Sequence, residues 1–414
     1  MSAVGGPLQG DGGRTAVDGP SDHGAPAVDG SRHGAAALVA GPLRGRVVDA
    51  RSDEAARAWA TLSALRGGLP VMRDRAWTDA WARTYGDVTR PAYVLVEDAA
   101  GTLQGGALIA SSRRWFGPVP IRTLWIGTAN TPRGQEVCSE FSPVLAHPGR
   151  EAEVVRAVRA TARRARRWDQ IRIDGVPEDD VAAHVAGWPA ERVRRRADPA
   201  PRFRLDRLAP GAEVATGLSG GPRRRARTSL RALAAAGRVE TEWATSPDDV
   251  GDVLEDLMRL HQARWTRDGH PGLFGDGRFA AMHRGLLPTL AAQGRAVLFR
   301  LRLDGETVGC LYLLVDGDRL AFYQSGFADL GDNRLRPGLV THLHCMAEAR
   351  DRGYAVYDFL AGDARYKREL SDERLTTTRI ELRRPRVRLA LFDVAHRGRE
   401  WVRVAREAAR RGDA

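Results

Sequence analysis

The chain of 414 residues carries 64 Lys and Arg against 52 Asp and Glu, which gives a formal net charge of +12 at pH 7. That length predicts two or three domains that each bury a core. A content of 43% hydrophobic and 28% charged residues is typical of globular proteins. The charge favours anionic partners, but every basic residue except Lys367 is an arginine. This bias indicates a GC-rich coding sequence, which explains part of the charge without nucleic-acid binding.

Three cysteines, Cys138, Cys310 and Cys345, are spread along the chain and form no CxxC pair. Such a sparse, odd set argues against a disulfide framework and a zinc site, and it favours a reducing compartment. The first residues lack the basic and apolar regions of a signal peptide. No stretch reaches the ~18 apolar residues of a membrane span. We therefore expect a cytoplasmic protein without a metal.

Residues 1–44 are rich in Gly, Ala, Asp and Pro, and this composition predicts a disordered tail. Periodicity then predicts helices and strands in a fixed order. The first half is expected to contain helices 53–65 and 77–84, strands 92–97, 103–111 and 123–126, helix 151–168 and strand 170–174.

The second half repeats this order. We expect helix 223–238, strand 239–244, helices 250–267 and 277–293, strands 296–303, 307–315 and 319–325, helix 337–352, strand 354–360 and a last helix from 389. The repetition predicts a duplicated α+β unit.

The segment 319–358 reads as strand, loop, helix and strand. This arrangement puts the amides of a helix start at one end of a sheet, where they bind phosphate well. Pro337 suits a first helical turn, Gly338 allows a close approach to the backbone, and Arg334 and Arg336 add positive charge. Taken alone, the pattern is common in α/β proteins.

A wider set of motifs is more specific. In chain order they are LHQARW from Leu260, GHPGLF, FAAMH, FYQSGF, RPG and YDFLAGDARYK. Together they resemble the acetyltransferase domain of the GNAT superfamily in its CelD-like group, which is related to the Fem-type aminoacyl transferases. The resemblance covers about 223–383, and 46–174 resembles the degenerate GNAT-like half that such proteins often carry.

The resemblance implies an α+β, GNAT-like fold with two tandem domains, each a mixed central sheet flanked by helices. The expected division is a tail at 1–44, a degenerate GNAT-like domain at 45–205, a GNAT acyltransferase domain at 206–388 and a C-terminal helix at 389–414. The sheet should part between strands 319–325 and 354–360.

The same resemblance implies an acyl-CoA co-substrate, with acetyl-CoA favoured. Its pantetheine arm would pair with the parted strand, and its pyrophosphate would lie on Arg334, Arg336, Pro337 and Gly338 at the helix start. An amine acceptor would enter the opposite side of the parted strands. Such chemistry requires a base for the amine, a donor for the oxyanion and an acid for the thiolate.

Three residues are candidates for this catalysis. Asp358 is the candidate base or amine-positioning carboxylate, with a structural ion pair to an arginine as the alternative. His283 is a second candidate base, or a histidine packed in a helix. Tyr323 is the candidate proton donor, with core packing as the alternative.

Further candidates line the acceptor pocket. His261, Arg264 and Trp265 share one helix face and bind substrate or pack that helix. Gln324 is the neighbour of Tyr323 on the parted strand. Lys367 marks either a position that requires a compact ammonium or a chance survivor among arginines.

Three functions remain open. The first is an N-acyltransferase acting on an amine of a sugar, polysaccharide precursor or small metabolite. The second is a Fem-like transferase that uses aminoacyl-tRNA, with the basic segment 223–238 as its contact. The third is a non-catalytic GNAT-fold component of polysaccharide biosynthesis, which is kept open because Ala361 and Arg336 replace the family's usual Arg and Ser.

Overall fold

The computed structural model describes residues 42–394, apart from 66–68, 133–134, 136, 138–139, 142–143 and 276. The expected disordered tail lies outside these residues up to position 41, and the first strand already begins at Arg44. Most of the expected C-terminal helix also lies outside them, although 387–394 are helical.

The first half follows the expected order and adds four elements to it: β1, β5, α4 and β7. Its strands are β1 (Arg44–Asp49), β2 (Ala92–Glu97), β3 (Leu103–Phe116), β4 (Val119–Ile126), β5 (Val144–Ala146), β6 (Gln170–Pro177) and β7 (Val193–Arg204). Its α-helices are α1 (Asp53–Leu65), α2 (Arg75–Thr89), α3 (Glu151–Ala165) and α4 (Glu178–Val185).

The second half repeats the same order of elements. Its strands are β8 (Val239–Ala244), β9 (Ala296–Leu303), β10 (Glu306–Asp316), β11 (Arg319–Phe327), β12 (Val356–Asp358) and β13 (Glu373–Arg383). Its α-helices are α5 (Gly220–Ala236), α6 (Pro247–Arg267), α7 (Arg278–Ala292), α8 (Pro337–Asp351) and α9 (Arg365–Glu369). Short 3₁₀ turns lie at Val71–Arg73, Ala190–Arg192, Leu205–Arg207 and Val214–Gly217.

The described strands form one mixed sheet. Its order is β1-β2-β3-β4-β6-β13-β7-β12-β11-β10-β9-β8, with β5 beside β3. In each half an antiparallel meander is followed by a helix, α3 or α8, and then by a strand that pairs parallel to the meander's last strand. The α+β, GNAT-like class and its tandem arrangement are therefore confirmed.

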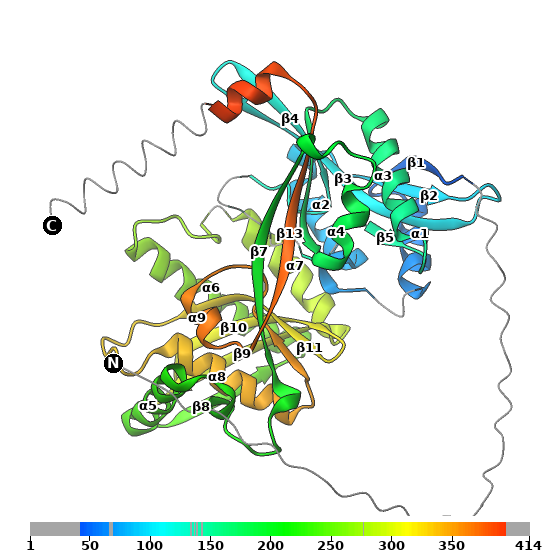
Figure 1. Cartoon of the computed structure of the whole chain (residues 1–414). Coiled ribbons are helices and arrows are strands. Elements are labelled where there is room, and N and C mark those ends of the chain that lie inside the picture. Colours follow the sequence, from blue (N-terminus) through cyan, green and yellow to red (C-terminus); the bar gives the residue numbers. More distant parts are fainter. Residues whose placement is uncertain are drawn as a thin grey trace, which may run out of the picture. The chain divides into compact units, whose positions relative to one another are not determined.

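The two halves exchange their last strands. β7 leaves the first half and pairs with β12 of the second, whereas β13 leaves the second half and pairs with β6 of the first. The exchanged strands also pair with each other, and Figure 1 shows them side by side in green and orange. The division at 205/206 stays a prediction, but neither half completes its sheet without the other.

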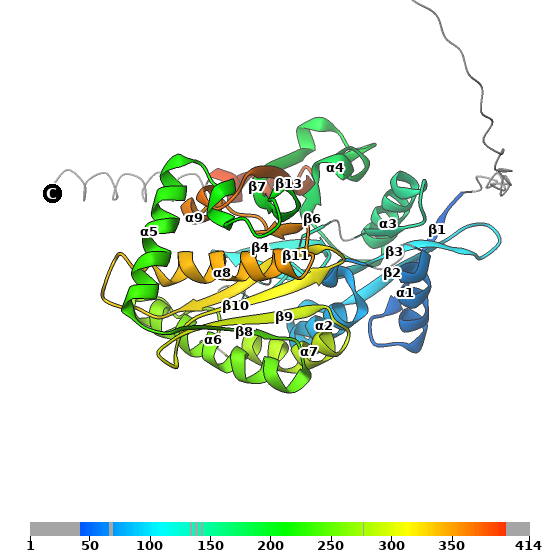
Figure 2. The same cartoon turned by 90° about the horizontal axis from the view of Figure 1, so that it is seen from below.

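Helices cover both faces of this sheet. α5 and α8 lie on one face of the second half, and α6 and α7 lie on the other (Figure 2). α6 and α7 share a core with α1 and α2 of the first half. Polar contacts join the halves beside this core: Arg295 pairs with Asp74 at 2.8 Å, and the Val71 amide donates to Asp316 Oδ1 at 2.7 Å.

Neither β7 nor β13 was expected from the sequence analysis. β7 contains Pro199 and Pro201, which disfavour an inner strand because they lack an N–H. The backbone groups of both prolines face the irregular segment that follows β12. Their carbonyl oxygens accept hydrogen bonds there from the amides of Gly362 and Phe359, at 2.9 and 3.0 Å. This segment requires no backbone N–H donor from positions 199 and 201, so the inner strand tolerates prolines there.

The strand exchange predicts that the halves fold only together. When 1–210 and 211–414 are produced separately, each should lack a cooperative unfolding transition, because β6 and β12 lose their neighbours. Mixed or co-produced, the two fragments should form a 1:1 complex that unfolds cooperatively, as measured by size-exclusion chromatography and circular dichroism. A single fragment with its own sharp transition would contradict the interdependence.

Candidate active site

β11 and β12 part in the middle of the sheet. They pair only from Arg319 opposite Val356 to Ala321 opposite Asp358, and β11 then continues to Phe327 without a parallel partner among the described residues. The expected parting is present, although β12 is shorter than the expected strand. A cavity of about 380 Å³, called here the cleft cavity, opens where the strands separate.

The cleft cavity brings together most of the candidates for substrate binding. Its lining residues are His261, Arg264, Trp265, Phe322, Tyr323, Gln324, Ser325, Gly326, Phe327, Leu360, Ala361, Tyr366 and Lys367. The list contains all five substrate candidates and one of the three catalytic candidates, Tyr323. Asp358 and His283 are not in the lining.

Lys367 holds the far wall of the cleft in place. Its ammonium donates to the carbonyl oxygens of Phe359, Ala361 and Leu360 at 2.7, 2.9 and 3.4 Å. Leu360 has a positive φ of 57°, so the chain turns sharply here. Three donors on one nitrogen suit three converging carbonyls, whereas a planar guanidinium does not. This geometry explains a lone lysine in an arginine-rich chain.

Replacing Lys367 should therefore destabilise the protein. Lys367→Met keeps the length of the side chain but removes three charge-assisted hydrogen bonds, so the free energy of unfolding should fall by about 2 kcal/mol in urea. Lys367→Arg should not restore it. The control is Arg365→Met, since Arg365 is exposed and pairs with Glu369 on the same short helix, α9; we expect a change within about 0.5 kcal/mol. Equal effects of the two methionine variants would contradict this role for Lys367.

Tyr323 lies at an irregularity in β11. Tyr312 lies opposite Gln324 and Leu313 opposite Phe322, so the ladder skips Tyr323. Such a bulge re-aims a side chain out of the regular pleat. The Tyr323 hydroxyl lies 3.3 Å from His283 Nε2, and the two rings are 5.1 Å apart.

His283 is buried beneath Tyr323 and does not reach the cleft cavity. It is 1% exposed and packs against the rings of Trp77, Phe279 and Tyr312. Burial lowers its pKa from 6.5 to about 3, so the ring is neutral near pH 7. Its position fits a residue that orients Tyr323.

The lowered pKa of His283 predicts a pH dependence of stability. Below pH 6.5 the unfolded chain takes up a proton that the folded ring excludes, so stability is lost as pH falls toward 3. Between pH 6.5 and 5 this one residue should contribute a slope approaching ~1.4 kcal/mol per pH unit. His283→Phe should have a shallower slope by that amount in urea unfolding. His270→Gln, which changes an exposed histidine, is the control; parallel curves for wild type and His283→Phe would contradict the assignment.

His261 lines the cleft cavity and has a buried, unprotonated ring nitrogen. It lies on α6, and its Nδ1 is 3.0 Å from the Ser325 carbonyl oxygen. Because a carbonyl only accepts, Nδ1 carries the proton and Nε2 keeps its lone pair. Nε2 has no hydrogen-bond partner within the described part of the chain. Burial lowers the pKa of His261, which keeps this lone pair available at neutral pH.

Asp358 lies in an ion pair rather than in the cleft wall. Its Oδ2 accepts from Arg319 at 3.1 Å, its Oδ1 accepts from the Leu360 amide at 2.7 Å, and the residue is 3% exposed. Burial raises its pKa, while Arg319 opposes the rise. Arg319 also binds Asp316, which in turn receives the Val71 amide. The structural alternative therefore describes Asp358 better than a catalytic role does.

The residues expected to hold the pyrophosphate lie at the start of α8, outside the cleft lining. Arg336 adopts a positive φ of 42° as the cap of this helix, and Arg334 is exposed and paired with Asp332 at 2.8 Å. A Cβ added to Gly338 would meet the Phe327 ring at 3.2 Å. Phe327 lines the cleft cavity, so this helix start adjoins one end of the cavity.

Two more cavities continue from the cleft along β6, β7 and β13. Ala361 lines both the cleft cavity and a second one, the Glu140 cavity, which also contains Asp174 and Asp198. The Ala361 amide donates to Glu140 Oε1 at 2.7 Å.

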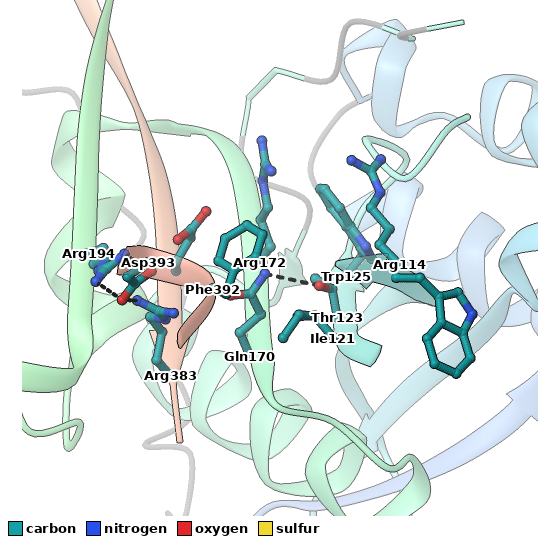
Figure 3. A pocket seen from close by; sticks show the side chains of 12 residues that line it. Arg114, Ile121, Thr123, Trp125, Gln170, Arg172, Arg194, Arg383, Phe392 and Asp393 are labelled. Atoms are coloured by element: carbon teal, nitrogen blue, oxygen red, sulfur yellow. Dashed lines mark hydrogen bonds and ion pairs between the residues drawn. The ribbon is translucent and has the colours of Figure 1, made fainter. Parts of the chain in front are cut away.

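Arg114, Trp125 and Arg172 line both the Glu140 cavity and a third one, the Phe392 cavity (Figure 3). There, Asp393 lies between Arg194 and Arg383, at 2.5 and 2.8 Å. No motif pointed to these cavities, because they form only where β7 and β13, which the sequence did not reveal, lie beside β6.

Comparisons with known proteins agree with this geometry. Residues 221–368 match the acetyltransferase (GNAT) domain family. That stretch is a GNAT acetyltransferase domain. The matched stretch spans α5 to α9, including the parted strands and the start of α8, and it supports an acyltransferase.

Solved structures show the same fold over most of the chain. A crystal structure of FemX has 13% sequence identity and a TM-score of 0.53, covering 82% of this chain and 97% of that one. The C-terminal domain of a putative lysylphosphatidylglycerol synthetase from Agrobacterium fabrum has 14% identity and a TM-score of 0.50, covering 83% and 95%. No curated protein matches the chain by sequence.

None of the helices in the described residues has the length and apolar character of a membrane span. Within the same residues, no group of three or more His, Cys, Asp or Glu side chains is arranged to hold a metal ion.

Proposed function

We propose that this protein transfers an acyl group from an acyl-thioester, acyl-CoA being the favoured donor and acetyl-CoA its simplest form, to an amine. The observation that carries the proposal is the unpaired edge of β11 beyond Ala321, which faces the cleft cavity. A pantetheine arm carries two amides, and a free strand edge binds an extended amide chain by strand addition. The start of α8 adjoins the same cavity and suits the donor's phosphates.

In this proposal His261 is the general base. The amine attacks the thioester carbonyl, and His261 Nε2 accepts the proton that the amine loses. Backbone N–H groups of the free β11 edge stabilise the oxyanion. The carbon–sulfur bond then breaks, and the thiolate takes the proton of the Tyr323 hydroxyl, which His283 orients from behind. Solvent returns the proton from His261 to Tyr323, so the products are an amide and a free thiol.

The acceptor is proposed to approach through the Glu140 cavity. Its lining offers both carboxylates and guanidinium groups, with Arg172 and Arg379 paired to Asp174, which suits a polar acceptor. Ala361 is the shared wall that leads into the cleft. An amino sugar, a polysaccharide precursor or a small amine metabolite fits this description, and polysaccharide biosynthesis is the pathway we favour. The buried free thiols of Cys310 and Cys345 suit a reducing compartment, so we propose the cytoplasm.

Aminoacyl-tRNA is the second donor considered, since Fem-type relatives resemble this chain. The segment 223–238 was its expected contact, but three of its arginines are engaged within the protein. Arg223 donates to the Leu218 carbonyl at 2.9 Å, Arg225 pairs with Glu369 at 2.8 Å and Arg227 pairs with Glu213 at 3.0 Å. Because these arginines already have partners within the protein, we favour acyl-CoA as the donor. A non-catalytic role is the third reading, and it predicts no thioester binding.

Binding and turnover test the proposal together. Acetyl-CoA at saturating concentration should raise the thermal unfolding midpoint, and amino sugars should accelerate thiol release from it. His261→Gln and Tyr323→Phe should each lower kcat by ~10²-fold or more while acetyl-CoA binding changes little. The low-pH limb of the wild-type kcat profile should disappear in His261→Gln.

The control is His270→Gln, an exposed histidine beyond the end of α6, which should keep wild-type turnover. A midpoint that rises only with aminoacyl-tRNA would favour the Fem-like reaction. A midpoint that responds to neither donor would exclude both transferase readings. Asp358→Asn does not separate the readings, because removing one partner of a buried ion pair destabilises the fold by about 3–5 kcal/mol.

A further inference from the structure

A fourth cavity, the Trp–Arg cavity, lies on the sheet face that α3 and α4 cover. It shares no residue with the cleft cavity. The residues that matter are Arg163, Trp168, Trp188, Arg192, Arg384 and Arg386. No Asp or Glu belongs to the described lining. The cavity is therefore strongly positive, with five arginines in its lining.

Two tryptophans hold two of these guanidinium groups, those of Arg163 and Arg384. The Arg384 Cζ lies 3.9 Å from the ring centroid of Trp168, and the Arg163 Cζ lies 4.9 Å from that of Trp188. Trp168 is only 2% exposed, and its ring is 6.0 Å from Trp188. An arginine stacked on an indole keeps its N–H edge free for other partners. The stack therefore presents fixed donors to a ligand.

The protein does not neutralise this cluster within its described residues. No ion pair or hydrogen bond joins the side chain of Arg163, Arg384 or Arg386 to a carboxylate there. The nearby acid, Asp169, is fully buried, and its carboxylate accepts from Arg388 and from the Arg122 amide. Burial lowers the pKa of Arg384, and the neighbouring Arg386 and Arg163 lower it further.

The Phe392 cavity shows what a neutralised arginine set looks like in the same chain. Arg172 pairs with Asp174 at 2.9 Å, and Arg194 and Arg383 share Asp393. Because the whole chain is rich in arginine, positive charge alone does not identify a binding site. The distinguishing feature of the Trp–Arg cavity is that Arg163, Arg384 and Arg386 lie together without a carboxylate partner among the described residues, whereas Arg192 pairs with Glu191 at 3.9 Å and Arg383 with Asp393 at 2.8 Å. A bound anion would offset the mutual repulsion of these three arginines.

We propose that the Trp–Arg cavity binds the phosphate groups of a small polyanion. Guanidinium edges bind phosphate oxygens in pairs, and four arginines match a ligand with two or more phosphate charges. The cavity volume of about 550 Å³ suits a compact ligand rather than an extended chain. The site is independent of the acyl transfer proposed above, and its ligand is either inorganic polyphosphate or the diphosphate of a nucleotide.

Calorimetric titration of the full chain with inorganic pyrophosphate, at balanced ionic strength, tests the proposal. Pyrophosphate should bind at this site, and Arg384→Gln and Arg386→Gln should each weaken binding by ~10-fold or more. Arg231→Gln, on the exposed face of α5, should leave it unchanged. Arg336→Gln removes a candidate phosphate contact at the start of α8, and it should leave pyrophosphate binding at the Trp–Arg cavity unchanged. ADP binding tighter than pyrophosphate would identify a nucleotide source; equal binding would identify inorganic polyphosphate.

Thermal unfolding without the ligand separates a binding role from a structural one. At low ionic strength, Arg386→Gln should keep or raise the unfolding midpoint, because it removes a like charge from the cluster. Pyrophosphate should raise the midpoint of wild type but not that of Arg386→Gln. The proposal is overturned if both arginine variants bind pyrophosphate as wild type does, or if only RNA binds and the variants abolish that binding.

Discussion

One ammonium group maintains the opening on which the GNAT site depends. Lys367 donates hydrogen bonds to three successive carbonyl oxygens, those of Phe359, Leu360 and Ala361, and so keeps the chain turned away from β11. On the far side of this turn, β7 presents only the carbonyls of Pro199 and Pro201, so no regular ladder draws the turn into the sheet. If residues 359–361 instead continued β12, the edge of β11 would be paired and the cleft would close.

The sequence was most informative where local pattern alone decides structure. β8 and β9 have the bounds that alternation predicts, and the order of helices and strands in both halves is correct. It failed where a distant partner decides: β7, with Pro199 and Pro201 among its arginines, and β13 are strands because each completes the other half's sheet. β12 was predicted too long, since the turn held by Lys367 is a side-chain effect that periodicity does not record.

The same distinction applies to the site. Motif resemblance brought His261, Arg264, Trp265, Tyr323, Gln324 and Lys367 into one group, and they line one cavity. It did not assign their roles, because roles depend on hydrogen bonds. The Ser325 carbonyl oxygen binds the protonated Nδ1 of His261, so Nε2 of that ring can accept a proton. In contrast, Arg319 and the Leu360 amide engage both carboxylate oxygens of Asp358. Neighbours that lie 64 or 39 positions away in the sequence determine these differences.

The exchange of β7 and β13 also has a consequence for synthesis on the ribosome. β6 is complete once position 177 emerges, yet the strand that must lie beside it begins at 373. During the intervening elongation the first half exposes an unsatisfied sheet edge, which invites pairing with other chains. The nascent chain keeps this exposed edge until its last strand is made, and slow translation of the second half prolongs the exposure.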